Sequence, residues 1–305
     1  MPGGLPWCRF VESIAGSPSE TPTCPRERKK QPMSIPSHEQ AGESEAIGVN
    51  WSDELERLHE ESSRAHPVDI WTREVMLARL GDLRDNATVV DVGCSAGYLL
   101  EDLRELLPSA SLIGIDLMLS GLRRAHTNVP DALIAQADAC HLPISDDYVD
   151  ALVSANLLEH VQADHAALAE IRRVLRPGGI AVLVVPASPG SFDYYDRFLL
   201  HQRRYGRGEL ARKCRSVGLE VTQDIYLCSL IFPAFWLVKR RNRRRFDQLK
   251  GADLAERVAQ DITKTQHSAL LALTCRLERF LLARRVFLPF GIRSLAVVKC
   301  PEEIR

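Results

Sequence analysis

Three aspartates are spaced so that a parallel sheet would bring them to one edge. Asp91 lies in the apolar run 88–92, Asp116 ends the next run, and Asp138 comes a few residues after a third run. The carboxyl ends of parallel strands share an edge, where open α/β folds bind ligands. There Asp116 can accept hydrogen bonds from ribose hydroxyls, and Asp138 can reach an adenine amino group. The spacing predicts a nucleoside site, although each acid taken singly also suits a solvated strand end.

A glycine-rich turn follows Asp91 directly, in the sequence Asp-Val-Gly-Cys-Ser-Ala-Gly at 91–97. Gly93 and Gly97 suit a sharp strand-to-helix turn, because a side chain there would block a ligand from the backbone. The backbone amides of the turn and of the helix that follows can face an anion or a carboxylate. A tight turn without a ligand is the alternative. A dinucleotide fingerprint would place a third glycine at position 100, where this chain has Leu100.

Apolar runs that alternate with helical patterns position these residues. The predicted strands lie at 88–92, 112–115, 132–135, 149–154, 180–185, 219–225 and 294–299. The predicted helices include 98–107, a segment through Leu175, 209–217 and a segment through 270–281. Pro177-Gly178-Gly179 predicts a turn after the second helix. Near-continuous apolar strands indicate burial on both faces, so the sequence predicts an α/β fold with a doubly wound, mostly parallel sheet and helices on both faces.

Length and composition restrict the class of protein. The chain has 305 residues, of which 45% are hydrophobic and 26% charged, which excludes collagen-like, coiled-coil and wholly disordered classes. No apolar stretch is long enough for a membrane-spanning helix, and residues 1–30 lack a signal-peptide pattern, so we expect a cytoplasmic protein. The eight cysteines include no C-x-x-C pair, which predicts reduced thiols, with neither a disulfide framework nor a metal site.

Charge is distributed unevenly along the chain. Residues 51–200 hold 12 Lys and Arg against 24 Asp and Glu, whereas residues 201–250 hold 13 against 4. An acidic body with one basic segment argues against a nucleic-acid partner, because no basic face runs through the fold.

The organisation that we predict has four parts. Residues 1–50 are rich in Pro, Ser, Glu and Gly and are expected to be disordered, with Met33 as an alternative start of translation. Residues 51–226 form the core, 227–290 an apolar and basic helical insert or lid, and 291–305 the last strand and the tail. The long separation between the last two strands indicates that the insert has structure of its own.

Several of these segments together resemble the class I S-adenosylmethionine-dependent methyltransferases, of the type 11/12 methyltransferase domain. The matching segments are DVGCSAG at 91–97, LIGIDLM at 112–118, AQADACHLPISDDYVDALVSANLLEHV at 135–161 and RRVLRPGGIAVLVVP at 172–186. The resemblance covers roughly residues 80–226 and the final strand. It implies a seven-stranded sheet with S-adenosylmethionine as cofactor.

The resemblance also implies roles for individual residues. Asp91 would orient the ammonium group, Asp116 would hold the ribose, and Asp138 with Ala139 would frame the adenine. The other cofactor-binding positions implied are Gly93, Ser95 and Gly97 beside the methionine moiety, Leu117 after the second strand, and Asn156 in the segment 156–160 that closes the pocket. Ser95 replaces the middle glycine of the commonest family pattern, but it is small enough to preserve the turn.

Three side chains are candidates for handling a proton of the methyl acceptor. Alignment of the acceptor with the cofactor's methyl group can lower the activation barrier by about 7–11 kcal/mol, so a base is useful without being compulsory. His160 follows the fourth predicted strand, where it could instead shape the loop together with Glu159. His201 and Tyr205 lie in a segment of the form H-x-R-R-Y, which in relatives lines the acceptor side and could equally clamp the next helix.

The insert begins with an apolar stretch at 225–238 and continues into six cations within residues 239–245. This pairing predicts either a lid over the pocket or a peripheral contact with an anionic membrane. Both fit a small or lipid-linked acceptor methylated at O, N or C. A non-catalytic cofactor-binding or membrane-docking protein of the same fold is the alternative function, and an NAD-dependent enzyme is disfavoured by Leu100.

Overall fold

Seven strands form one sheet at the centre of the protein. The computed structural model describes residues 64, 66–246, 248–266 and 268–302. The strands are β1 (Thr88–Val92), β2 (Ser111–Asp116), β3 (Leu133–Gln136), β4 (Val149–Ala155), β5 (Leu175–Pro186), β6 (Glu220–Leu227) and β7 (Arg293–Lys299). Their order is β3-β2-β1-β4-β5-β7-β6, and only β7 runs antiparallel to its neighbours. The predicted seven-stranded, mostly parallel sheet is therefore confirmed.

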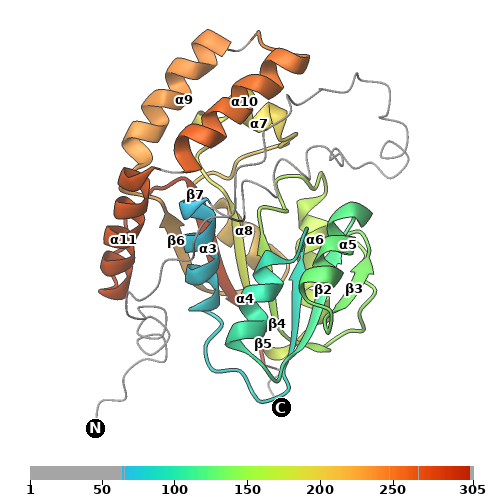
Figure 1. The fold of residues 1–305 in the computed structure, drawn as a ribbon. Helices are drawn as coiled ribbons and strands as arrows, with labels where there is room; N and C mark the ends of the chain where they lie inside the picture. The colour runs from blue at the N-terminus through green and yellow to red at the C-terminus, as the bar shows by residue number, and fades with distance from the viewer. Residues whose placement is uncertain (1–63, 65, 247, 267, 303–305) are drawn as a thin grey trace, which may run out of the picture. The chain divides into compact units, whose positions relative to one another are not determined.

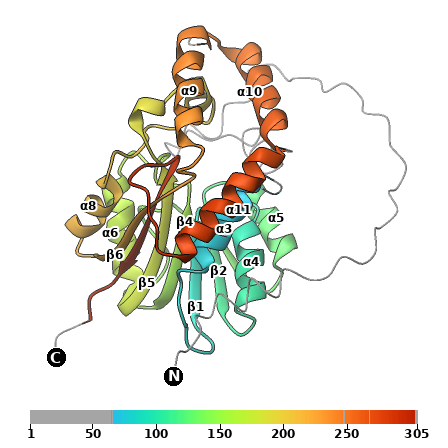
Figure 2. The ribbon, with the colours of Figure 1, turned by 90° about the vertical axis from the view of Figure 1, so that its left-hand side faces the viewer.

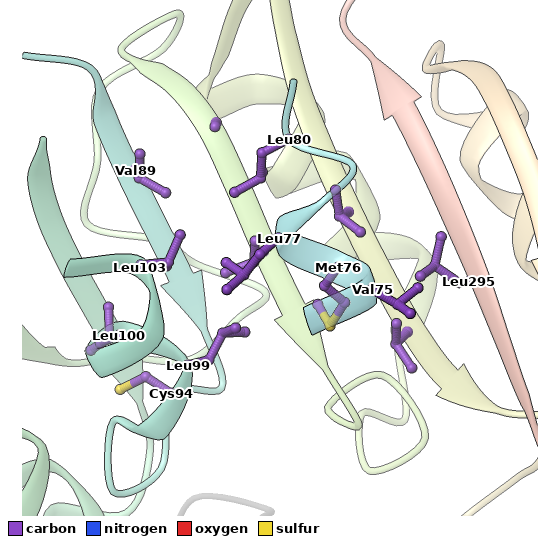
Figure 3. Packing of buried hydrophobic residues seen from close by; sticks show 14 of the residues in the cluster. Val75, Met76, Leu77, Leu80, Val89, Cys94, Leu99, Leu100, Leu103 and Leu295 are labelled. Carbon is purple, nitrogen blue, oxygen red and sulfur yellow. The ribbon is translucent and has the colours of Figure 1, made fainter. Parts of the chain in front are cut away.

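Helices cover both faces of this sheet, as predicted. Those of the core are α3 (Pro67–Leu77), α4 (Tyr98–Leu106), α5 (Leu119–Asn128), α6 (Asp164–Val174), α7 (Tyr194–Phe198) and α8 (Glu209–Ser216). Side chains of α3 and α4 pack on one face together with Val89 and Leu295 of the strands (Figure 3). Side chains of α6 and α8 pack on the other face, against Val90 and Leu152. Successive strand residues point to opposite faces, so both apolar sets are buried and the strands lack a polar side.

The Pro177-Gly178-Gly179 segment, where the sequence predicts a turn, lies within the bounds of β5, but residues 176–179 have no partner in β4. Helix α6 ends at Val174, and β5 begins at the next residue. The register against β4 shifts here, because Val149 pairs with Leu175 and Ala151 pairs with Ile180. A Cβ at Gly179 would stand 2.8 Å from the carbonyl oxygen of Arg176, so this irregularity needs a glycine.

The insert before the last strand consists of α9 (Phe232–Phe246), α10 (Gly251–Gln266) and α11 (Ala269–Ala283). Helices α9 and α10 lie at the upper end of the ribbon and both pack against α7, whereas α11 lies along α3 (Figures 1 and 2). The predicted apolar stretch is divided, since its first three residues belong to β6 and its last seven begin α9.

Two predictions fall partly or wholly on other parts of the chain. The expected disorder of residues 1–50 and the start at Met33 lie outside the described residues. None of the helices in the described ranges is long and apolar enough to cross a membrane.

Candidate active site

The turn between β1 and α4 has the left-handed backbone that its glycines permit. Gly93 has φ +83° and Gly97 has φ +84°, and Ser95 between them also lies at positive φ, +47°. A Cβ at Gly97 would stand 3.0 Å from Cα of Ala125 in α5. Glycine is therefore required here by the packing of α5 as well as by the backbone angle. The turn keeps its shape with Ser95 in place of the commoner glycine.

Asp116 ties this turn to the end of β2. Its Oδ2 accepts a hydrogen bond of 2.9 Å from the backbone N–H of Ser95, and its Oδ1 accepts one of 2.9 Å from Met118. Each carboxylate oxygen has a second acceptor position. The carboxylate is thus held at the carboxyl edge of the sheet, where a carboxylate can accept hydrogen bonds from hydroxyl groups.

Asp91 is a buried carboxylate beside Asp116. It is 2% exposed, and its side chain forms no hydrogen bond with another of the described residues. Burial, and then the charge of Asp116, raises the pKa of Asp91 to about 8. A cation that bound beside Asp91 would relieve both effects, because it would stabilise the ionised carboxylate.

The residues expected around an adenine occupy the loop after β3 and the end of β2. Oδ1 of Asp138 accepts a 2.8 Å hydrogen bond from the backbone N–H of Cys140, while its side chain remains 42% exposed. Ala139 is buried and Leu117 is half-buried. The backbone of Leu117 is fixed to β3, because its carbonyl oxygen accepts a 2.8 Å hydrogen bond from Nε2 of Gln136.

The loop after β4 lies directly against the glycine turn. Asn156 begins it with a positive φ of +54°, and its N–H donates to the carbonyl of Val184 at 2.9 Å. Leu157 follows, and its Cβ would be 3.0 Å from a Cβ placed on Gly93. The loop that closes the predicted pocket is therefore packed onto the turn that forms its floor.

Glu159, at the far end of this loop, is a functional candidate that the sequence does not reveal. The residue is fully buried, and neither of its carboxylate oxygens has a hydrogen-bond partner in the described part of the chain. Burial is the largest effect on this group and raises the pKa of Glu159 to about 8, against the opposing effects of its own backbone N–H and then of the charges of Arg293 and Arg204. The L-L-E-H sequence places an acid beside His160, but nothing in the sequence indicates burial without a partner.

His201 meets Glu159 and His160 from the segment after α7. Its Nε2 lies 3.9 Å from Oε1 of Glu159, and its ring makes an edge contact with His160 at a centroid distance of 4.8 Å. Two hydrogen bonds from Gln202 reach the carbonyl oxygens of Glu159 and His160, at 2.9 and 3.0 Å. The structure thus brings together the two predicted histidines, which are 41 positions apart.

Asp196 of α7 orients His201 from the other side. Its Oδ1 lies 2.9 Å from Nδ1 of His201 and accepts a 2.6 Å hydrogen bond from Nε of Arg204. Burial alone would raise the pKa of Asp196, but the bond to His201 and the charges of Arg204 and Lys239 hold it well below its ordinary value. An ionised Asp196 favours the proton of His201 on Nδ1, so that Nε2 faces Glu159 with its lone pair.

Tyr205 is separated from this cluster. Its side chain is fully buried, and its hydroxyl donates a 2.7 Å hydrogen bond to Oδ2 of Asp164 at the start of α6. Burial and this bond raise the pKa of the hydroxyl far above its usual value. These contacts favour a structural role for Tyr205, the clamp on a neighbouring helix that is the alternative to a catalytic role.

One of the six cations expected at the surface is buried. Lys239 of α9 is 8% exposed, and its Nζ lies 2.6 Å from Oδ1 of Asp193 and 3.9 Å from Oδ2 of Asp196. The prediction of six solvated or lipid-facing cations is therefore wrong for Lys239. The other five, at 240, 241 and 243–245, are exposed.

The position that distinguishes a dinucleotide fingerprint is part of the core. Leu100 is fully buried in α4, and its Cδ1 would lie 2.7 Å from a Cβ on Gly114 of β2. A glycine at position 100 would leave a cavity, so the helix is built for leucine.

These features together fit a nucleoside that carries an ammonium group. Asp116 is a carboxylate of the kind that accepts hydrogen bonds from ribose hydroxyls, Asp91 is a buried carboxylate in need of a cation, and the turn between them is shaped by glycines. The donor set therefore suits S-adenosylmethionine, whose α-amino group is an ammonium near neutral pH.

Comparisons with known proteins also indicate a methyltransferase domain. A family model described as a methyltransferase domain matches residues 90–183. Over 118 residues the chain is 38% identical to an uncharacterised protein of a Streptomyces fradiae transposon, covering 37% of this chain and 34% of that protein. It is 37% identical over 116 residues to a trans-aconitate 2-methyltransferase of Azoarcus, covering 36% and 43% of the two chains. A demethylmenaquinone methyltransferase of Streptomyces avermitilis is 33% identical over 114 residues, covering 37% and 48%. The chain thus spans less than half the length of these three relatives.

Solved structures share the fold at low sequence identity. Phosphoethanolamine N-methyltransferase 2 of Haemonchus contortus, solved with S-adenosylmethionine, has a TM-score of 0.52 at 15% identity and covers 76% of this chain and 52% of that one. Geranyl diphosphate C-methyltransferase of Streptomyces coelicolor has a TM-score of 0.51 at 13% identity and covers 82% and 85%. At such identities the likeness shows the fold alone.

Proposed function

The chain contains a class I S-adenosylmethionine-dependent methyltransferase domain, and from this premise we propose that it methylates a small-molecule or lipid-like acceptor at oxygen, nitrogen or carbon. The observation that carries the proposal is the paired arrangement of Asp91 and Asp116 around the glycine turn, with Asp138 in the loop after β3. The relatives act on acceptors as different as trans-aconitate and demethylmenaquinone, so the acceptor has to be argued from this chain's own residues.

We assign the cofactor-binding roles as follows. The carboxylate of Asp91 pairs with the ammonium group, and the backbone at Gly93, Ser95 and Gly97 accommodates the methionine moiety. Asp116 accepts hydrogen bonds from the ribose hydroxyls. The adenine lies between Leu117 and the Asp138–Ala139 segment, and Asn156 and Leu157 close the pocket above the turn.

The cofactor supplies a methyl group on a sulfonium, which already has a good leaving group, so the protein's main tasks are alignment and exclusion of water. Leu157, which lies against Gly93, would exclude water from this side of the glycine turn. The acceptor would approach from the side of Glu159, His160 and His201, where polar groups can bind an acceptor oxygen or nitrogen and influence its proton. Tyr205 has no part in this proposal, because its hydroxyl is buried against Asp164.

We also propose that the outer face of α9 makes the peripheral contact with an anionic surface. Leu237 is 63% exposed and Val238 is 53% exposed, next to the arginines at 240, 241, 244 and 245. Exposed apolar groups beside cations are the combination that binds anionic lipid. A lipid-linked acceptor would be delivered by the same contact.

Calorimetric titration of the full chain with S-adenosylmethionine and with NAD tests the proposal. We expect heat with the first ligand and none with the second, whereas binding of NAD alone would overturn it.

Asp116→Ala should weaken binding of S-adenosylmethionine by about 10- to 100-fold, because each hydrogen bond to a charged group contributes about 1.5–3 kcal/mol. The control Asp82→Ala changes an exposed acid before β1, at the opposite edge of the sheet, and should leave the affinity unchanged.

A second assay separates an enzyme from a protein that only binds the cofactor. The chain is incubated with S-adenosylmethionine labelled in its methyl group and with small-molecule and lipid extracts of cells. Label in an extractable product that Asp116→Ala fails to form supports the enzyme. Tight cofactor binding without any transfer from either extract would favour the non-catalytic alternative.

A further inference from the structure

Glu159, His160 and His201 form a cluster of metal-ligating side chains. One ligand atom of each residue lies within 4.8 Å of those of the other two. Glu159 and His160 come from the loop after β4, whereas His201 comes from the segment after α7. Hydrogen bonds from Gln202 to the carbonyl oxygens of Glu159 and His160 hold the two segments together. The cluster is therefore fixed by backbone contacts and does not depend on flexible side chains alone.

Glu159 is the member of this cluster whose charge and hydrogen-bonding capacity are not satisfied by the neighbouring side chains that the structure describes. Its side chain is completely buried, and within the described residues neither oxygen is hydrogen-bonded. A buried carboxylate without partners is costly in either protonation state, since a charge needs a cation and a neutral acid needs an acceptor. The nearest nitrogen of His201 is 3.9 Å away, which is too far for a hydrogen bond. A cation between the two would satisfy the carboxylate.

His201 is prepared as a ligand by Asp196. Metal-binding histidines usually donate their other ring N–H to a carboxylate, which fixes the tautomer and the ring orientation. The 2.9 Å contact between Nδ1 of His201 and Oδ1 of Asp196 has this form. Arg204 and Lys239 hold Asp196 in its ionised state, at 2.6 and 3.9 Å from the carboxylate. Nε2 of His201 is left facing Glu159.

We propose that Glu159, His160 and His201 bind one divalent transition-metal ion. Two imidazoles and one carboxylate suit zinc, iron, cobalt and nickel better than they suit magnesium or calcium, which prefer oxygen ligands. Ligand bonds of about 2.0–2.2 Å require ligand atoms roughly 3–4 Å apart. The 3.9 Å separation between Glu159 and His201 fits this range, and the widest separation of 4.8 Å requires a small inward shift.

Such an ion would act on the methyl acceptor, a role that rests on the proposed function. Three protein ligands leave coordination positions for an oxygen of the acceptor, such as a hydroxyl, enol or carboxylate oxygen. Binding to the metal favours the deprotonated oxygen, and its proton leaves to solvent. The oxygen then forms a bond to the methyl carbon as the carbon–sulfur bond breaks, and the electron pair of that bond stays on the sulfur.

The test uses the full chain without an affinity tag, stripped with a chelator and then titrated with Zn²⁺ or Co²⁺. Calorimetry should show one equivalent bound, and Co²⁺ should give visible d–d absorption without thiolate bands in the near ultraviolet. Glu159→Gln should weaken binding by about 100-fold or more, and Asp196→Asn, which replaces the orienting carboxylate, by about 10- to 100-fold. The control His165→Asn changes an exposed histidine on α6 and should bind as the parent does.

A measurement on the parent alone keeps the test independent of how the variants fold. X-ray absorption of the metal-loaded parent should show nitrogen and oxygen ligands with imidazole scattering and no sulfur. Lack of binding, thiolate ligation, or equal affinity in the parent and in folded Glu159→Gln would overturn the proposal.

Titration of the same samples with S-adenosylmethionine separates this proposal from the proposed function. Cofactor binding without metal binding removes the metal site alone. Metal binding without cofactor binding removes the proposed function and leaves the metal site standing.

Discussion

Nζ of Lys239 lies 2.6 Å from Oδ1 of Asp193, inside the protein. Lys239 belongs to the insert helix α9, whereas Asp193 is the N-cap of α7 in the core. Burial lowers the pKa of Lys239 and raises that of Asp193, so the low-polarity surroundings oppose both charges, and each charge supports the other. This pair joins the insert to the helix whose Asp196 orients His201.

Lys239→Met should therefore destabilise the protein by on the order of 3 kcal/mol, because it leaves Asp193 buried without its cation. The free energy of unfolding in urea measures the effect. Arg241→Met, which removes an exposed cation two positions along the same helix, is the matched control and should change stability by less than about 0.5 kcal/mol. Equal losses in both variants would contradict a special role for the buried pair.

The exposed arginines of α9 predict binding to anionic vesicles. Replacing Arg240, Arg241, Arg244 and Arg245 by Gln, with Lys239 kept, should reduce sedimentation with anionic liposomes, since each cation contributes about 1 kcal/mol near such a surface. Vesicles of zwitterionic lipid should retain neither protein. If the substituted protein and its parent sediment equally with anionic vesicles, α9 is not a lipid-binding face.

The raised pKa of Asp91 predicts that cofactor binding releases a proton. Its pKa of about 8 in the free protein leaves it mostly protonated at pH 7, whereas pairing with an ammonium requires the ionised form. Affinity should therefore fall by up to about tenfold for each pH unit below 7. Above pH 8 it should fall again, because the ligand's amino group loses its own proton.

Calorimetry at pH 7 in two buffers of different ionisation enthalpy measures this proton directly. We expect nearly one proton released by the parent and almost none by Asp91→Asn, which should also lose the acidic limb of the pH profile. The same proton release from both proteins would show that Asp91 does not pair with the ligand.

Alanine substitutions at Gly97 and Gly218 distinguish the cost of a left-handed backbone from the cost of steric crowding. The two glycines have almost the same backbone angle, φ +84° and +85°, but a Cβ on Gly97 would stand 3.0 Å from Ala125, and one on Gly218 meets no atom within 4 Å. Gly218→Ala should cost about 1–2 kcal/mol for the left-handed backbone alone. Gly97→Ala should cost about 1–3 kcal/mol more, because α5 must move. Thermal or urea unfolding measures both, and equal losses would show that α5 accommodates the methyl group freely.

Tyr205→Phe distinguishes a clamp from a catalytic hydroxyl. Loss of the bond to Asp164 should lower the free energy of unfolding by about 1–3 kcal/mol and leave the affinity for S-adenosylmethionine unchanged. Tyr148→Phe, at a side chain that is 56% exposed, is the control for removing a hydroxyl. A variant of unchanged stability that loses methyl transfer would restore the catalytic interpretation.

Local sequence determines much of this fold. The run Thr88–Val92, the glycines after it and the acids at 116 and 138 define a strand, a turn and a sheet edge, because a continuous apolar run and a positive φ depend on neighbouring residues. The same reasoning does not give the strand bounds at Pro177-Gly178-Gly179. These residues lie within the bounds of β5, where the register passes from Val149–Leu175 to Ala151–Ile180 and leaves 176–179 without partners in β4.

Tertiary structure alone decided which polar groups are buried and which of them meet. Lys239 belongs to a run of cations that predicts a solvent-exposed helix face. The packing of α9 on α7 instead places its side chain inside the protein, against Asp193. Glu159 and His201 are far apart in the chain, and only the docking of the segment after α7 onto the loop after β4 brings them within 3.9 Å. Burial and distance depend on how elements pack, and a pattern of residue types along one chain does not contain that information.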